Sequence, residues 1–316
     1  MLKKLRVSSS PHIRSNETVT TIMRDVLIAL VPSMVMAIVF FRVQAVILLL
    51  TCMAASLIIE WGVHITFKRK IDFTDTSPLV TGILLALIVP SNLPLWMAII
   101  GVFVAIFFGK MVFGGLGHNI FNPALVGRCF LLASWPVAMT NWASFDGVSG
   151  ATVLNTIKMH GNSAATALFG TTSGEYLHMF LGSRLGSLGE TSTLALLIGA
   201  LYLFLRRTIS WHTPASMIGT VFLLSWCVGR DPILSIMSGG LILGAFFMAT
   251  DMVTTPKTGM GKIIFGVGAG ALVVWIRVKG GYPEGVAYAI LLMNAVTPLI
   301  DKMTKPKPFG YGGKNA

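Results

Sequence analysis

Long apolar runs separated by short polar breaks dominate this amino-acid sequence. Ten such runs can be marked, at about 24–41, 44–67, 76–90, 93–113, 119–135, 191–206, 212–229, 232–249, 258–277 and 284–300. A helix needs about 20 mainly apolar residues to cross a bilayer, and runs of this length are too long for the strands of a membrane barrel. The pattern therefore predicts an all-α polytopic membrane protein with about ten transmembrane helices.

Two of these segments, 76–90 and 119–135, are short or interrupted. The first ends at Pro90 and the second contains Asn122-Pro123, while the second half of the chain has a similar break at Thr254-Thr-Pro256. Lipid cannot satisfy backbone groups freed by such breaks, so we expect the three breaks to meet inside the protein. Their helix dipoles would suit a bound cofactor or a passing cation. The alternative for Asn122 is an ordinary helix cap followed by proline in the first turn.

Weak internal repeats divide the chain into two halves. Thr81–Pro90 is similar to Ser238–Phe247, and Phe113–Asn119 is similar to Lys279–Glu284. Five spans in each half would place the halves in opposite orientations, which is an inverted repeat. The predicted parts are an N-terminal segment 1–23, a first five-helix repeat 24–135, a loop 136–190, a second five-helix repeat 191–300 and a C-terminal tail 301–316.

Composition and charge agree with a membrane protein. The chain is 54% hydrophobic and 11% charged, whereas soluble domains carry about 25% charged residues. The net charge of +12 does not indicate nucleic acid, because the basic residues cluster between apolar runs. With both termini in the cytoplasm, 17 of the 24 Lys and Arg residues lie inside and 6 outside. The excess inside predicts cytoplasmic termini and an outward-facing loop 136–190.

Two other features are explained by packing. Gly266-Val-Gly-Ala-Gly270 lies within an apolar run and follows no strand, so it indicates close helix approach rather than a dinucleotide loop. Cys52, Cys129 and Cys227 are isolated in apolar stretches, which predicts no metal site.

The outward interval contains a small polar segment, Asp146–Asn155. Its glycines permit tight turns, and its polar side chains can bond the nearby backbone. Thr152 offers a hydroxyl next to Gly150 and Ala151, whose small size leaves room for a large adduct.

Ser149-Gly-Ala-Thr152 resembles the flavin attachment motif of the membrane flavoproteins NqrB and RnfD. Three further stretches resemble motifs of this family, namely Pro11-His-Ile13, Gly114–Ala124 and Ala249–Pro256. The resemblance implies that Thr152 carries FMN through a phosphoester. It also implies a subunit that is not catalytic alone, within a complex coupling ferredoxin:NAD electron transfer to Na⁺ or H⁺ translocation in the cytoplasmic membrane of a bacterium or archaeon.

The same resemblance implies partners and a further cofactor. The partners are the other Rnf subunits, which carry iron–sulfur clusters and flavins, together with membrane lipid and the transferase that installs FMN. A second, non-covalent flavin such as riboflavin is also implied, although no residue identifies its site.

Four more residues are candidates for the flavin environment. Arg128, inside the fifth apolar run, could offset a reduced, anionic flavin or a phosphate. Asp251 lies at the end of the eighth run. It either has a functional role or extends its side chain to the membrane interface. Asn122 and Thr254 would couple the flavin to its surroundings from the helix breaks.

Two alternatives stay open at the level of sequence. His64 and His118 either take part in proton movement or are ordinary hydrogen-bonded interfacial residues. A small-solute channel or carrier with the same inverted repeat would have no redox role, and fold alone does not separate it from a flavoprotein. A carrier would be colourless, whereas a flavoprotein would be yellow.

Overall fold

The computed structural model describes residues 18–68, 75–143, 149–150, 154, 158, 172–182, 186–282 and 284–306. The first half contains α1 (Val19–Thr66), α2 (Ser77–Ile88), α3 (Leu95–Ile106), the π-helical turn η1 (Phe107–Met111), α4 (Pro123–Ser134) and α5 (Pro136–Thr140). A connecting region follows, with β1 (Trp142–Ala143), β2 (Ser149–Gly150), α8 (Thr172–Leu181) and the 3₁₀ turn η2 (Leu188–Glu190). The second half contains α9 (Thr193–Leu205), α10 (His212–Cys227), α11 (Pro232–Met237), α12 (Leu241–Leu243), the π-helical turn η3 (Gly244–Met248), α13 (Gly259–Lys279) and α14 (Val286–Thr304).

The prediction of a helical membrane protein is confirmed. Among the described residues, α1, α13 and α14 are long and apolar enough to cross a membrane. Helix α1 is interrupted at Arg42, whose φ of 50° and ψ of −126° are not helical. This interruption falls between the first and second apolar runs, and each predicted run overlaps at least one helix.

Helices α2 and α4 are too short to cross a bilayer alone. Each has 12 residues, or about 18 Å at 1.5 Å per residue, against a hydrocarbon core of about 30 Å. Nearly every residue of α2 is buried, so protein rather than lipid surrounds it. These helices therefore behave as the half-helices expected from their broken sequence.

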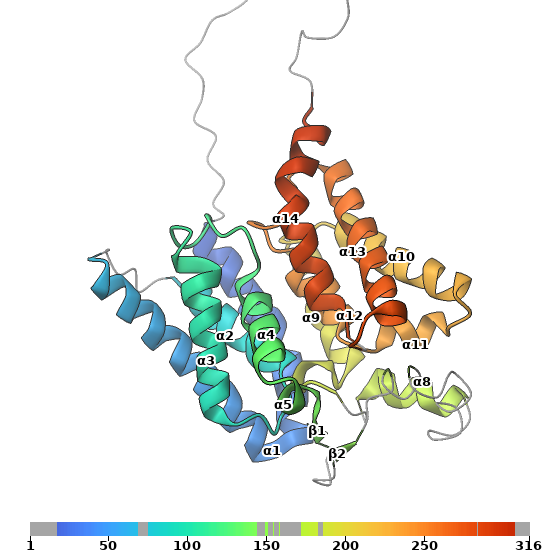
Figure 1. The fold of residues 1–316 in the computed structure, drawn as a ribbon, viewed down its shortest axis with the longest axis horizontal. Coiled ribbons are helices and arrows are strands. Elements are labelled where there is room, and N and C mark those ends of the chain that lie inside the picture. The colour runs from blue at the N-terminus through green and yellow to red at the C-terminus, as the bar shows by residue number, and fades with distance from the viewer. Residues whose placement is uncertain are drawn as a thin grey trace, which may run out of the picture.

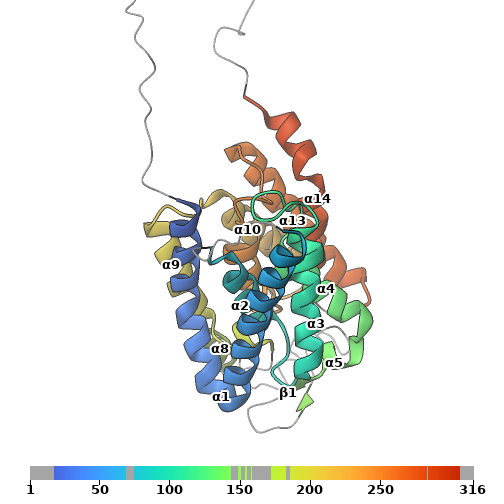
Figure 2. The ribbon, with the colours of Figure 1, turned by 90° about the vertical axis from the view of Figure 1, so that its left-hand side faces the viewer.

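The molecule has two distinct ends (Figures 1 and 2). The described chain begins at Thr18 and stops at Pro306 at one end, here called the terminal end, whereas β1 and β2 lie at the opposite, hairpin end. The interval expected as a plain loop, 136–190, also contains α5, α8 and η2. The first half packs beside the second half, with α1 against α9 and α4 against α14.

The glycine-rich run of α13 packs closely against α10. A Cβ added at Gly266 would lie 2.7 Å from the carbonyl oxygen of Thr213, and one at Gly270 would lie 2.7 Å from that of Met217. Helix pairs approach this closely where small residues leave the backbones unobstructed. The interpretation of this run as a packing surface is confirmed.

This contact predicts different effects for two identical substitutions. Gly270→Ala should destabilise the protein by about 1 to 3 kcal/mol, because the added methyl group meets a backbone oxygen that cannot move aside. Gly219→Ala in α10, where a Cβ meets nothing within 4 Å, is the matched control. It should be neutral or stabilising by up to about 1 kcal/mol. Thermal unfolding followed by size-exclusion recovery measures both, and equal melting temperatures would contradict the proposed contact.

Candidate functional site

A hydrogen-bonded junction joins the two halves of the chain. The side-chain oxygen of Asn122 accepts from the N–H groups of Ala124 at 3.1 Å and Leu125 at 3.4 Å, which caps α4. Its side-chain nitrogen donates to the carbonyl of Met248, at 3.4 Å. The amide of Asn294 in α14, oriented to satisfy its neighbours, accepts from the N–H of Asn122 at 3.1 Å. We call Asn122, Met248 and Asn294 the junction.

A π-helical turn lies close to the junction in each half. Turn η3 ends at Met248, whose carbonyl accepts from Asn122. Turn η1 is followed by the loop that leads to Asn122. Such turns occur frequently at functional sites because they change the direction of the following side chains.

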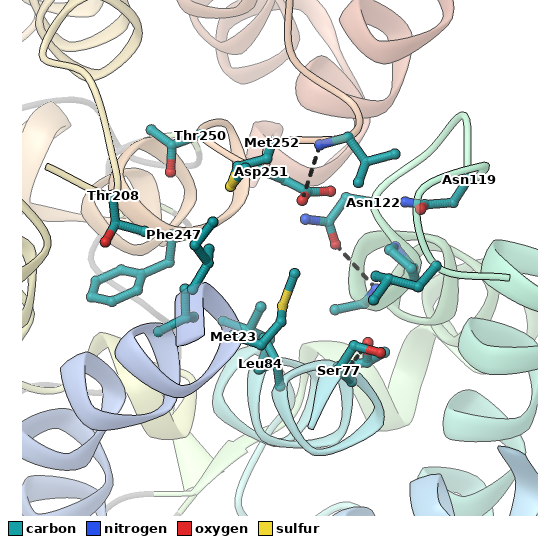
Figure 3. Close-up of a pocket in the computed structure, with 18 of the residues that line it drawn as sticks. Met23, Ser77, Leu84, Asn119, Asn122, Thr208, Phe247, Thr250, Asp251 and Met252 are labelled. Carbon is teal, nitrogen blue, oxygen red and sulfur yellow. Dashed lines mark hydrogen bonds between the residues drawn. The ribbon is translucent and has the colours of Figure 1, made fainter. Parts of the chain in front are cut away.

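The terminal end contains a pocket with an interior volume of about 80 Å³, here called the terminal pocket. Its walls are largely apolar and include Met23, Leu84 and Phe247 (Figure 3). The polar side chains in its lining include Ser77, Lys110, Asn119, Asn122, Thr208, Thr250 and Asp251. A largely apolar lining with a few polar groups is typical of a site for a small organic ligand.

The structure brings three predicted residues together at this pocket. Asp251 and Asn122 come from the two different halves and both line it (Figure 3). A carboxylate oxygen of Asp251 accepts from the hydroxyl of Thr254, at 3.1 Å. The carbonyl of Thr254 accepts from the hydroxyl of Thr297 in α14, at 3.0 Å. Asp251 is half-buried in the pocket lining, and burial raises the pKa of its carboxyl group.

The expected position of Pro90 is wrong. Helix α2 places its first residue, Ser77, at the terminal pocket, and Pro90 follows the opposite end of the same helix. There the carbonyl of Val89 accepts from the N–H of Leu188 in η2, at 3.4 Å. The break at Pro90 therefore has its own partner and does not join those at Asn122 and Thr254.

Lys110 is a site residue that the sequence analysis missed. The distribution of Lys and Arg places Lys110 on the cytoplasmic side, but its side chain is only 2% exposed. Its ammonium donates to both carboxylate oxygens of Glu60, at 2.6 and 2.8 Å, and to the hydroxyl of Ser77, at 2.6 Å. Glu60 and Lys110 each lie inside an apolar run, where ionisable residues are rare. This feature of the sequence could have identified the pair.

Arg128 lines a second, smaller cavity with an interior volume of about 20 Å³. Its guanidinium donates to the carboxylate of Glu284 and lies 3.9 Å from that of Glu190. Gly239 and Gly240 also line this cavity, with φ angles of 66° and 68° that favour glycine. A Cβ at Gly240 would lie 2.4 Å from a carboxylate oxygen of Glu190. Arg128 therefore has two carboxylate partners, and its role toward a flavin stays a prediction.

The candidate attachment segment begins at the hairpin end. Gly150 pairs with Trp142 and Ser149 pairs with Ala143 in the antiparallel strands β1 and β2. Ala151 and Thr152 lie outside the described residues, so their assignment stays a prediction from the sequence.

Two contacts on the far side of Thr152 bind the chain to the second half. Leu154 is buried, and a Cβ at Gly239 would lie 2.4 Å from its methyl carbon. The ammonium of Lys158 donates to the carbonyls of Gly280 and Tyr282, the second at 3.1 Å. Contacts at residues 149–150, 154 and 158 thus connect this segment to the hairpin end, close to the cavity of Arg128.

Comparison with known proteins places the chain in a family. Residues 6–310 match the NQR2, RnfD, RnfE family. The chain is 49% identical to the D subunit of the proton-translocating ferredoxin:NAD(+) oxidoreductase complex of Clostridium ljungdahlii, over 96% of each chain. It is 43% identical to the D subunit of the Na(+)-translocating ferredoxin:NAD(+) oxidoreductase complex of Acetobacterium woodii, over 97% of this chain and 95% of the relative. It is 36% identical to the D subunit of the ion-translocating oxidoreductase complex of Alcanivorax borkumensis, over 98% of each.

The carboxyl group of Glu284, beside Arg128, predicts that the stability of the folded protein depends on pH. Burial, with the charge of Glu190 second, raises the pKa of Glu284 from 4.5 to about 7, although Arg128 and Arg277 oppose the shift. The folded protein therefore holds this proton more tightly than the unfolded chain does. The stability that the proton contributes is full below about pH 4.5 and is lost as the pH rises through about 7.

Glu284→Gln should remove this loss, because an amide does not ionise. We expect the melting temperature of the variant to fall less than that of the wild type between about pH 5 and about pH 8. Asp301→Asn, which removes a carboxylate at the terminal end, is the control and should keep the wild-type slope. Parallel curves for Glu284→Gln and the wild type would contradict the assignment.

Proposed function

The chain belongs to the NQR2, RnfD, RnfE family, and we propose on this premise that it is the D subunit of an ion-translocating ferredoxin:NAD oxidoreductase complex. The observation that carries the proposal is similarity over nearly the whole length of relatives with that name. The chain passes electrons inside the complex and is not catalytic alone. The relatives include both proton- and sodium-translocating complexes, so either ion fits the family.

The arrangement of the helices supports ten spans in two inverted repeats. The first half begins at the terminal end and the second half begins after η2 at the hairpin end, so the halves run in opposite directions (Figure 1). Each half contains one π-helical turn close to the junction. In this proposal the terminal end is cytoplasmic and the hairpin end, with Thr152, faces outward, as the distribution of basic residues predicts.

Thr152 carries FMN through a phosphoester in this proposal. The support is the Ser149-Gly-Ala-Thr152 motif and the position of its neighbours at the hairpin end. Lys158 and Arg230 lie there also, and a guanidinium nitrogen of Arg230 is 3.4 Å from the carbonyl of Arg277. A phosphate would therefore meet a positively charged environment.

The terminal pocket holds the second, non-covalent flavin in this proposal. A flavin ring is planar and largely apolar, with polar atoms at one edge, and the lining of the pocket offers both kinds of contact. Asn122 and Asp251 would bond the polar edge, while Phe247 and Leu84 would contact the ring faces. When bound, the flavin supplies the electron-transfer chemistry, whereas the protein supplies position and charge.

A small-solute carrier is the rival function, because the terminal pocket could also hold a solute. The attachment motif and the family favour the flavoprotein. The two functions differ in colour and in covalent mass.

Intact-mass analysis tests the proposal directly. Wild-type chain, from cells that have the flavin transferase, should exceed its sequence mass by FMN less one water. Thr152→Ala should have its bare sequence mass, because the acceptor hydroxyl is gone. Thr140→Ala, an exposed threonine at the hairpin end whose hydroxyl bonds the backbone of its own helix α5, is the control and should keep the adduct. An unmodified wild-type mass, together with colourless protein, would support the carrier instead.

A further inference from the structure

We propose that a relay of side chains carries protons from the surface of the terminal end to the terminal pocket. The relay consists of Asp75, Ser77 and Lys110, and Glu60 and His64 support the charge of Lys110. This inference rests on the proposed function, because it requires a ligand in the pocket that takes up protons when it is reduced. The comparisons assign no role to these five residues.

Lys110 is the buried end of the relay. It lies in η1, lines the terminal pocket and has a side chain only 2% exposed. All three N–H bonds of its ammonium have partners, two on Glu60 and one on Ser77. Burying an ammonium group costs several kcal/mol unless its partners are well placed. Because all three N–H bonds are taken, one of them has to turn away from Ser77 before the ammonium can donate to a group bound in the pocket.

Ser77 connects Lys110 to the surface. Its hydroxyl accepts from Lys110 at 2.6 Å and donates to a carboxylate oxygen of Asp75 at 2.9 Å. A hydroxyl that accepts and donates at the same time can pass a proton along by exchanging its own hydrogen. The side chain of Asp75 is 22% exposed and precedes α2, so it can exchange protons with water. Ser77, at the start of α2, is among the residues that line the pocket (Figure 3).

Glu60 and His64 on α1 support the charge of Lys110. The imidazole of His64 lies one helical turn from Glu60, 4.0 Å from its carboxylate, and is 22% exposed. This distance is too long for a hydrogen bond, so the pair supports the charge of Lys110, and the route through Ser77 and Asp75 carries the proton. The titratable groups that face Lys110 are thus Glu60 and His64 from α1, Asp75 before α2, and Asp251 across the pocket.

The relay balances the chemistry of a reduction. A group that accepts two electrons and one proton would fit this site, and one-electron carriers in the partner subunits would supply its electrons. The ammonium of Lys110 would turn one N–H from Ser77 toward the pocket and give up that proton, which the bound group would take. Lys110 then regains a proton from the hydroxyl of Ser77, which takes one from Asp75, and Asp75 takes one from water. The site ends with its original charge, and one proton has moved inward.

Proton uptake during reduction tests the relay. The purified, complete complex is mixed with dithionite in weakly buffered solution containing a pH-indicator dye, and the dye change given by dithionite alone is subtracted. In the wild type, we expect proton uptake to keep step with bleaching of the flavin absorbance. In Ser77→Ala and Asp75→Asn, uptake of one proton per chain should lag by at least about tenfold, as expected for loss of a proton-transfer group.

Two further variants separate the relay from a structural role. Thr66→Val is the matched control, because Thr66 lies on α1 near His64, is exposed, does not line the pocket and bonds only the backbone carbonyl of Gly62. It should behave as the wild type. The double variant Glu60→Gln/Lys110→Met removes both charges without leaving one buried and unpaired. It should lag like Ser77→Ala. If it fails to assemble, the single variants at Ser77 and Asp75 decide alone.

Uptake that keeps step with bleaching in Ser77→Ala and Asp75→Asn would overturn the relay and leave a purely structural ion pair. Flavin content distinguishes this result from failure of the proposed function. A chain that releases no non-covalent flavin on denaturation would contradict the proposed occupant of the pocket. A chain that releases flavin and shows unchanged uptake would contradict only the relay.

Discussion

Interrupted helices inside a membrane protein must find hydrogen-bond partners within the protein, because lipid offers none. The junction meets this requirement: Asn122 caps α4, bonds the last carbonyl of η3 at Met248 and receives support from Asn294. Since these residues come from both halves, the junction fixes the halves against each other. The terminal pocket and the cavity of Arg128 lie on either side of it, with Asn122 lining the first and Met248 the second. Both candidate sites therefore depend on one set of hydrogen bonds.

The sequence predicts the fold well where the signal is local. Apolar length identifies the helices, the break at Arg42 separates the two parts of α1, and the small residues of α13 indicate its contact with α10. The π-helical turns η1 and η3 could not be predicted, because they insert one extra residue into a helix without a sequence signature. Their positions depend on packing between distant segments.

The candidate site is predictable only in part, for the same reason. Breaks at Asn122 and Thr254 indicate that polar groups must meet inside the protein, and the structure brings them together with Asp251. Pro90 is an exception, because α2 carries it to the other end. The bond of Lys110 to Glu60 joins residues 50 positions apart, which spacing alone cannot reveal. The assignment of Thr152 as the attachment site rests on the sequence motif, because this residue lies outside the described residues.

The central proposal is that this chain holds two flavins, one at the hairpin end of the molecule and one at the terminal end. A cryo-electron microscopy map of the purified complex tests it most directly. The account predicts planar density joined to Thr152 at the hairpin end, and a second planar density in the terminal pocket beside Asn122 and Asp251. An unmodified Thr152, or a terminal pocket filled only by lipid or side chains, would contradict it.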